Sequence, residues 1–232
     1  MKKRYFCFFL CLFPMLVMSQ TEFGISAGYN TFTVIIGQRE TVDDVTYTNL
    51  HDAYVLSFVA KQKTDKVFNL AIDVDYLHQS FMVDANSGGL GSSGADKLTF
   101  NVGRINIQVQ PQFVYGKKLR FYWYPGFYFG RIVISSVSGE SYFWNNMTNV
   151  GSKFLVNGSA GHYIPMYDFG LVVGMGLDIP LHNELSLLVE YSNSYSISGT
   201  SWGGTATHFL NLNFKVGVAY TIKPLKHQKD KK

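Results

Sequence analysis

Hydrophobic and polar residues alternate along the last extended stretch of the chain, from His208 to Ile222. A period of two indicates a β-strand with one apolar face and one polar face. The stretch is long, because a tilted strand needs only ~9 to 11 residues to cross a bilayer and strands of soluble proteins usually have about 5 or 6. We therefore predict a transmembrane strand with its apolar face toward lipid and its polar face toward a lumen. The apolar parity is Leu210, Leu212, Phe214, Val216, Val218, Tyr220 and Ile222, and the other is Phe209, Asn211, Asn213, Lys215, Gly217, Ala219 and Thr221.

The same alternation predicts seven earlier strands, joined by connections that are alternately long and short. Short turns at one end and long loops at the other are typical of outer-membrane barrels whose termini both lie in the periplasm. We predict an all-β fold, an eight-stranded antiparallel up-and-down transmembrane β-barrel. A ten-stranded barrel stays open, because the segment from Ser135 to Pro165 could contain a further hairpin. The seven stretches are residues 23–36, 53–61, 68–76, 98–113, 119–130, 167–179 and 184–195.

In two of these strands the apolar residues change parity partway along, near Asn30 and near Gly103. A β-bulge inserts one residue and reverses the faces of a strand, so we predict a bulge at each position. The segment from Val83 to Lys97 is rich in glycine and serine, and we predict a flexible loop there. The longer polar segment from Ser135 to Pro165 is predicted as another outer loop.

Charged and amide side chains fall on the parity that we predict to face the lumen. A soluble barrel of the lipocalin type would have an apolar interior, so this polarity favours a membrane barrel. About eight strands leave an interior that side chains just fill, and we expect paired charges to plug it. A narrow path for a solute or a proton is the alternative. The predicted lumen network is Asp73, Asp75, Arg104, Asn106, Gln108, Arg120, Asp168, Asp178, Glu190, Asn211 and Lys215.

The N-terminus has the pattern of a secretory signal. Three basic residues precede the apolar run Tyr5–Met18 and the small residue Ser19. We predict a signal peptide over residues 1–19, with cleavage after Ser19 or Gln20, a barrel domain over 20–222 and a basic tail over 223–232. Both cysteines, Cys7 and Cys11, lie in the signal, so the mature chain is expected to have no disulfide.

The positive charge of the chain comes from its ends. The formal net charge is +4; because residues 2–4 contribute +3 and the tail contributes +4, the residues between them sum to −3. This distribution gives no reason to expect a nucleic-acid partner.

Three neighbouring aromatic residues, Tyr142, Phe143 and Trp144, stand out within the longest predicted loop. Exposed aromatic side chains on an outer loop can bind a glycan or a protein, and they can equally cap a barrel. We expect a structural or interaction role through the extracellular loops.

An enzymatic alternative would use His78 and Ser80, which share one strand and one parity. An imidazole on the same face could activate the hydroxyl against an acyl ester, as in lipid A deacylases. No acidic partner is identifiable in the sequence, so we expect no enzymatic activity. The histidines lack metal-ligand spacing, and no metal or cofactor is predicted.

Several short motifs resemble the outer-membrane β-barrel domain of Bacteroidota that is called PorT-like. They are Phe23–Asn30 (FGISAGYN), Tyr124–Gly130 (YPGFYFG), Asp168-Phe169-Gly170 with Gly174 and Gly176, and Val216–Tyr220 (VGVAY). The resemblance covers nearly the whole mature chain, but its motifs are mostly glycine and aromatic spacing. It implies the fold and a bacterial outer-membrane location. We expect outer-membrane lipid, the barrel-insertion machinery and an unidentified extracellular or envelope protein as partners. Many such barrels end on an aromatic residue, whereas here the basic tail follows Ile222.

Overall fold

The computed structural model describes residues 20–36, 45–49, 53–64, 67–88, 92–145, 148–159, 166–182, 184–197, 200–202 and 205–222. The predicted signal peptide and basic tail lie outside the described residues. The described part of the chain contains no helix that is long and apolar enough to cross a membrane. Its strands are β1 (Gln20–Ile36), β2 (Val45–Asn49), β3 (Tyr54–Lys63), β4 (Phe68–Gly88), β5 (Ser92–Tyr115), β6 (Arg120–Asn145), β7 (Val150–Gly158), β8 (Tyr167–His182), β9 (Leu185–Ser196), β10 (Thr200–Trp202) and β11 (Thr205–Ile222).

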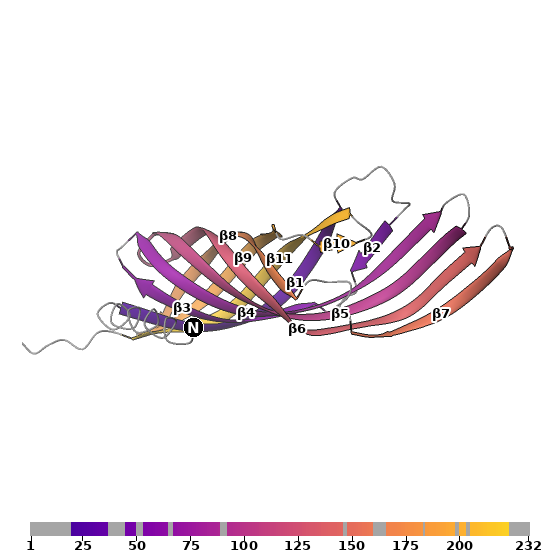
Figure 1. Ribbon diagram of the computed structural model, residues 1–232. Helices are drawn as coiled ribbons and strands as arrows, with labels where there is room; N and C mark the ends of the chain where they lie inside the picture. The colour runs from indigo at the N-terminus through magenta and orange to yellow at the C-terminus, as the bar shows by residue number, and fades with distance from the viewer. Residues whose placement is uncertain are drawn as a thin grey trace, which may run out of the picture.

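Eight of these strands form a closed antiparallel ring (Figure 1). Its order is β1, β3, β4, β5, β6, β8, β9 and β11, and the pairing of β1 with β11 closes it. The predicted eight-stranded up-and-down barrel is therefore confirmed. The short strands β2, β7 and β10 pair with β4, β6 and β11 and are not members of the ring.

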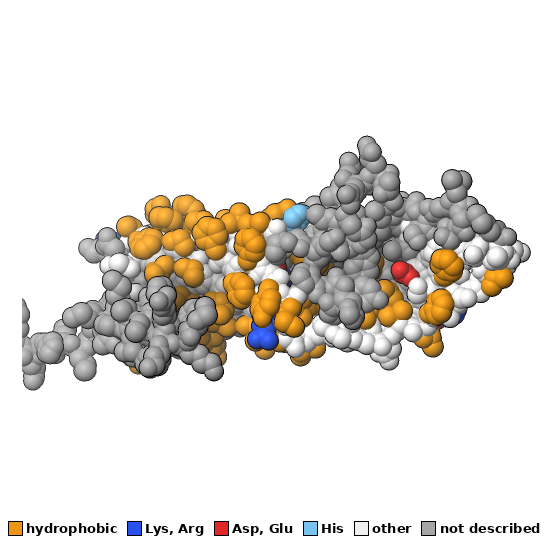
Figure 2. All heavy atoms as spheres, in the orientation of Figure 1, with side chains coloured by type: hydrophobic (Ala, Val, Ile, Leu, Met, Phe, Trp, Pro, Cys, Tyr) orange, Lys and Arg blue, Asp and Glu red, His pale blue; other side chains and the backbone are white. Residues whose placement is uncertain are grey.

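Apolar side chains lie on the outside of this barrel and polar side chains on the inside. In β8, for example, Leu171 and Val173 are 45% and 53% exposed, whereas Asp168 and Asp178 are 6% and 5% exposed. Figure 2 shows hydrophobic side chains over the outward face of the barrel end. A protein in water would have the opposite polarity, so this surface is suited to hydrocarbon.

Three ring strands continue past the ring, and with a fourth strand beside them they form a curved sheet, which Figure 1 shows at its right-hand end. We call it the extension; it consists of the outer parts of β4, β5 and β6 together with β7. The β4–β5 pairing runs without interruption from Phe68↔Phe113 to Gly88↔Ser93. The prediction of a flexible loop over Val83–Lys97 was therefore wrong. Glycine and serine have low strand propensity, but pairing with neighbouring strands outweighs it here.

The segment from Ser135 to Pro165, predicted as a loop, does contain a hairpin. β6 continues to Asn145 and β7 returns along it, from Asn145↔Val150 to Val137↔Gly158. Among the described strands β7 pairs only with β6, so this hairpin adds to the extension and leaves the ring at eight strands.

The two predicted bulges do not reverse β1 or β5. The β1–β11 register is continuous from Thr21↔Ile222 to Ile36↔Thr207, so no bulge occurs near Asn30. A register shift does occur at Gly103, but the additional residue, Val133, belongs to β6. The apolar residues changed parity for another reason: the interior of the barrel itself changes from polar to apolar.

This apolar interior is a cluster at the end of the barrel where the extension begins. We call it the mouth cluster. Phe81 packs between Phe32 and Phe100, with ring centroids 5.0 and 5.1 Å away. The cluster therefore closes the barrel with aromatic and aliphatic side chains. Its buried members are Phe32, Phe81, Val83, Leu98, Phe100, Val102 and Val137, against which Ile132, Val156 and Phe209 pack.

Candidate functional site

The lumen contains a series of ion pairs. The group at the end of the barrel where Thr21 pairs with Ile222 is centred on Glu22. This carboxylate lies 2.7 Å from Lys63 Nζ, 3.3 Å from Lys61 Nζ and 3.7 Å from Arg120. Arg120 also lies 2.7 Å from Asp178. Because β1, β3, β6 and β8 supply these residues, the group links strands from opposite sides of the ring.

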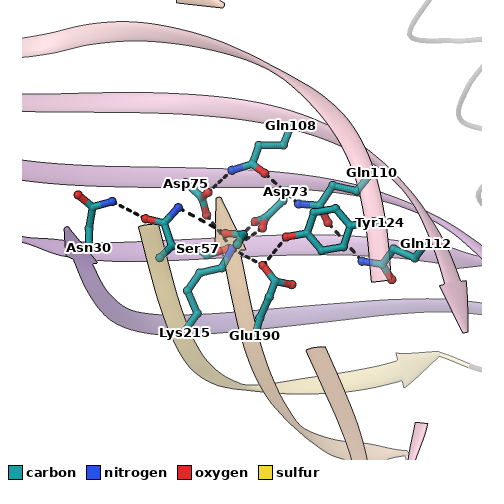
Figure 3. A network of polar contacts seen from close by, with 12 residues as sticks. Asn30, Ser57, Asp73, Asp75, Gln108, Gln110, Gln112, Tyr124, Glu190 and Lys215 are labelled. Atoms are coloured by element: carbon teal, nitrogen blue, oxygen red, sulfur yellow. Dashed lines mark hydrogen bonds and ion pairs between the residues drawn. The ribbon is translucent and has the colours of Figure 1, made fainter. Parts of the chain in front are cut away.

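The middle of the lumen is organised by Lys215 of β11 (Figure 3). Its ammonium lies 2.7 Å from Asp73, 2.8 Å from Glu190 and 3.3 Å from Asp75. All four side chains are at least nine-tenths buried. One buried cation therefore holds three carboxylates that would otherwise repel one another.

Neutral donors complete the coordination of these carboxylates. The hydroxyls of Tyr122 and Tyr124 donate to Glu190 over 2.9 and 2.8 Å. Ser57 donates to Asp73, and Gln108 donates to Asp75. Side chains of successive inward-facing glutamines then form a ladder in which Gln112 donates to Gln110 and Gln110 donates to Gln108.

Each inward tyrosine of β6 lies opposite a glycine of β8. The register pairs them as Tyr122↔Gly176, Tyr124↔Gly174 and Tyr128↔Gly170. A Cβ built on Gly174 would lie 2.4 Å from the ring of Tyr124, and one on Gly176 would lie 2.4 Å from the ring of Tyr122. These glycines therefore leave the space in which the tyrosines reach across the lumen.

Toward the mouth, a second ion pair and a set of amides fill the lumen. Arg104 lies 2.7 Å from Asp168, which also accepts hydrogen bonds from Tyr128 and Ser196. Gln79 donates to both Asn30 and Asn211, and Asn30 donates to Asn213.

The charges of these ion pairs nearly cancel. Five basic and six acidic side chains take part, which leaves a formal charge of −1. They are Lys61, Lys63, Arg104, Arg120 and Lys215 with Glu22, Asp73, Asp75, Asp168, Asp178 and Glu190. These ion pairs cross-link strands across the interior of the barrel.

The structure brings most of the residues of the predicted lumen network into these contacts. Asn106 is also buried in the lumen, but its Oδ1 has no hydrogen-bond partner. The sequence reasoning missed Glu22, Lys61 and Lys63, although their inward parity and charge were readable. It also missed the tyrosines of β6, because their position opposite glycines depends on the register between two strands.

The second candidate site lies on the extension. Tyr142, Phe143 and Trp144 are 43 to 47% exposed, and they belong to strand β6 rather than to a loop as predicted. They line a depression of about 700 Å³ that is open to solvent and that residues of β4, β5 and β7 complete. Trp144 faces Gly151, where an added Cβ would lie 2.3 Å from the indole.

A polar pair borders this aromatic surface. Lys153 lies 2.5 Å from Glu140 and 5.3 Å from the ring centroid of Tyr142. Tyr142 also donates a hydrogen bond to Glu140. The hydrogen bond from Lys153 holds the pKa of Glu140 below its usual range, and the same contact raises the pKa of Lys153.

His78 and Ser80 have separate partners. The His78 ring stacks on Tyr54 with 5.1 Å between centroids, and the Ser80 hydroxyl donates to Asn101 over 2.5 Å. Within the described residues, no group of three or more His, Cys, Asp or Glu side chains is arranged to hold a metal ion.

The sequence matches no family model and no curated protein. Among solved structures, the chain is similar to the attachment invasion locus protein Ail of Yersinia pestis, with a TM-score of 0.42, 12% identity and coverage of 86% of this chain and 98% of that one. It is similar to the outer membrane protein OprG of Pseudomonas aeruginosa, with a TM-score of 0.42, 13% identity and coverage of 89% and 98%. For Neisserial surface protein A the TM-score is 0.41, the identity 10% and the coverage 88% and 97%.

Proposed function

We propose that the protein is a bacterial outer-membrane β-barrel that anchors the extension outside the cell, where the extension binds an envelope or extracellular partner. The observation that carries this proposal is the length of β6. Its pairing with β8 ends at Arg131↔Tyr167, yet the strand continues to Asn145. At ~3.3 Å per residue, this continuation of β6 is roughly 45 Å long, measured along the strand.

The membrane part of the proposal rests on the outward face of the barrel. A Lys or Arg at the midplane of the bilayer costs about 2 to 4 kcal/mol, and the outward side chains of the ring strands are mainly aliphatic and aromatic. The closed ring also pairs its backbone groups from strand to strand, as a hydrocarbon environment requires. Outer-membrane lipid and the barrel-insertion machinery are therefore expected partners.

The two ends of the barrel support the proposed orientation. The short connections β3–β4, β5–β6 and β8–β9 lie at the same end as Thr21 and Ile222, and the extension lies at the other. Outer-membrane barrels usually have their short turns in the periplasm. This arrangement supports a periplasmic location for both termini and an extracellular location for the extension.

Cysteine labelling tests location and orientation together, because the predicted mature chain contains no other cysteine. We expect Leu155→Cys, on the extension and 79% exposed, to react with a membrane-impermeant maleimide on intact cells. Lys117→Cys, in the β5–β6 turn, should react only after the outer membrane is permeabilised. The reverse pattern would contradict the orientation, and protein in the soluble fraction would contradict the anchor.

The binding surface is tested by Tyr142→Ser combined with Trp144→Ser. A few central aromatic residues usually dominate binding, so we expect this variant to lose partner binding at least about tenfold. The readout is affinity for the partner identified by photo-crosslinking from Ser93, which lies opposite Trp144 in the register and lines the same depression. Phe129→Ser and Tyr167→Ser, an aromatic pair on the barrel wall, serve as the matched control. Equal loss in both variants would mean that the aromatic surface is not the site.

The esterase and the narrow channel are the competing functions. Mass spectrometry of lipid A incubated with the protein, with His78→Ala as the control, tests deacylation. The separate partners of His78 and Ser80 give no support to catalysis. Membership of the PorT-like family stays a prediction of the sequence.

A further inference from the structure

Strand β7 forms one edge of the extension (Figure 1). It pairs with β6 along its whole length, from Asn145↔Val150 to Val137↔Gly158. Within the part of the chain that the structure describes, neither strand pairing nor any other backbone hydrogen bond joins β7 to a segment besides β6. In an antiparallel pair, every second residue directs its N–H and C=O away from the partner strand. About half of the backbone groups of β7 are therefore available to a further strand.

β7 lacks the features that usually prevent strand addition at an exposed edge. Such edges are commonly very short, or they contain a proline, a bulge or a free lysine. β7 has nine residues, none of them proline, and its register with β6 is continuous. Its one charged residue, Lys153, lies 2.5 Å from Glu140 and 5.3 Å from the ring centroid of Tyr142, both in β6. This lysine is therefore engaged with β6 and does not shield the free edge.

Apolar side chains lie along this edge on both faces of the sheet. Val150 and Phe154 are 58% and 56% exposed on one parity, and Leu155 is 79% exposed on the other. Because they have a neighbouring strand on one side only, a strand added on the other side would cover them. Gly151 has no side chain of its own, and the Trp144 indole lies against it. A side chain of an added strand opposite Gly151 would therefore face the indole.

A second copy of this chain in the same membrane does not fit the edge. β7 runs from the tip of the extension, where Val150 pairs with Asn145, toward the ring, where Gly158 pairs with Val137. Two copies anchored in one membrane would direct β7 the same way, whereas an antiparallel pair needs opposite directions. Parallel pairing is slightly less stable for each residue. An extended segment of a different protein can approach in either direction, and it is the better occupant.

We propose that β7 accepts an extended segment of another protein as an additional antiparallel strand, which then becomes the edge of the extension. Backbone hydrogen bonds supply the affinity, and side chains at alternate positions supply the specificity. The segment carries apolar side chains opposite Phe154 and Leu155, because these are the apolar side chains left exposed in the middle of the edge. This inference rests on the proposed function, since it states the form in which the extension binds its partner.

The test places a strand beside β7 with a covalent tether. The full mature chain with Gly158→Cys, in micelles, is joined by a disulfide and a flexible linker to an octapeptide of alternating threonine and valine. Nothing lies within 4 Å of a Cβ at position 158. The tether makes pairing intramolecular, at an effective concentration of about a millimolar. We expect amide hydrogen exchange of about half of the β7 residues to slow at least about tenfold.

Methylated peptides distinguish strand addition from other contacts. A peptide methylated on alternate backbone nitrogens keeps its donors along one edge, so it should still protect β7. A peptide methylated on every nitrogen has no donors and should not. The control for the tether is Lys117→Cys, in the β5–β6 turn, from which the same peptide should leave β7 unchanged. Heat-modifiable gel mobility shows that both cysteine variants still form the barrel.

The same complexes test whether the partner uses this edge. We expect the tethered octapeptide to weaken binding of the crosslinked partner at least about tenfold, and the fully methylated peptide to leave it unchanged. Unslowed exchange in β7, equal slowing by the fully methylated peptide, or unchanged partner binding when the edge is occupied would each overturn the proposal. If Tyr142→Ser with Trp144→Ser abolishes partner binding and the occupied edge does not, this inference fails while the proposed function stands.

Discussion

The most consequential single residue of the lumen is Lys215, because it is the cation that Asp73, Asp75 and Glu190 share. Buried charges are tolerable only when they are paired and hydrogen-bonded. Tyr122, Tyr124, Ser57 and Gln108 supply the additional donors. The cluster thus connects β3, β4, β5, β6, β9 and β11 at one level of the barrel.

We predict that Lys215→Gln destabilises the barrel by about 3 to 5 kcal/mol, the usual effect of removing one partner from a buried ion pair. Unfolding by urea in micelles measures the change. The matched control is Lys153→Gln, which breaks an exposed ion pair and should have little effect on the same transition. Similar curves for the two variants would show that Lys215 does not organise the lumen.

A second prediction concerns the effect of Gly174 on the stability of the barrel. Gly174→Ala places a Cβ 2.4 Å from the Tyr124 ring, so this ring must shift, which disturbs its hydrogen bond to Glu190. Overpacking of this kind costs about 1 to 3 kcal/mol. Gly158→Ala is the control, since nothing lies within 4 Å of its added Cβ. The hypothesis fails if both alanine variants unfold at the same urea concentration.

Among the elements, the β6–β7 hairpin depends most on pairing between strands. Every described residue of β7 is exposed except partly buried Val156, which packs on the mouth cluster. The hairpin therefore has few apolar contacts of its own. Cross-strand contacts, such as that between Lys153 and Glu140, are therefore expected to stabilise the hairpin.

This contact predicts how the hairpin responds to pH. The pKa of Glu140 is lower in the folded hairpin than in the unfolded chain, so the pair stabilises the hairpin above the usual glutamate pKa of ~4.3. That contribution is lost as the pH falls through the lowered pKa. Amide hydrogen exchange, corrected for intrinsic rates, should show protection of β7 falling in acid relative to the barrel. In Glu140→Gln this acid-dependent loss should be absent, and its persistence there would assign it to another group.

For the molecule as a whole, we predict that the ion pairs of the lumen and the mouth cluster block the passage of solutes. The ion pairs and amides occupy the polar part of the interior, and aromatic side chains close its end below the extension. The fold thus combines a closed anchor with an exposed sheet. We propose that the extension is the surface that carries the function.

Conductance tests this closed state directly. In planar bilayers the purified protein should give no stepwise conductance above that of a bilayer treated with detergent alone. Stable open steps that recur from one preparation to the next would favour the narrow channel over the anchor.

The number of strands in the ring and the polarity of each strand face could be predicted from the sequence, because both depend on local periodicity. Asp73, Arg104 and Lys215 share a parity with polar neighbours, and that parity is inward in the structure. The partners were not predictable, since Lys215 and Asp73 are 142 residues apart and meet only when the ring closes. Parity gives the face of a residue but not its height in the lumen.

The sequence by itself determined which side chains of each ring strand share a face, because a period of two sorts each strand into faces before any strand has a neighbour. Only the tertiary structure decided that Phe32 and Phe100 keep the inward parity and pack in the mouth cluster, and that residues 83–88, 92–97, 135–145 and 150–158 belong to the strands of the extension. The physical reason is that pairing fixes the register across the whole sheet. A change from polar to apolar along one parity is read as a bulge until neighbouring strands show what the interior contains.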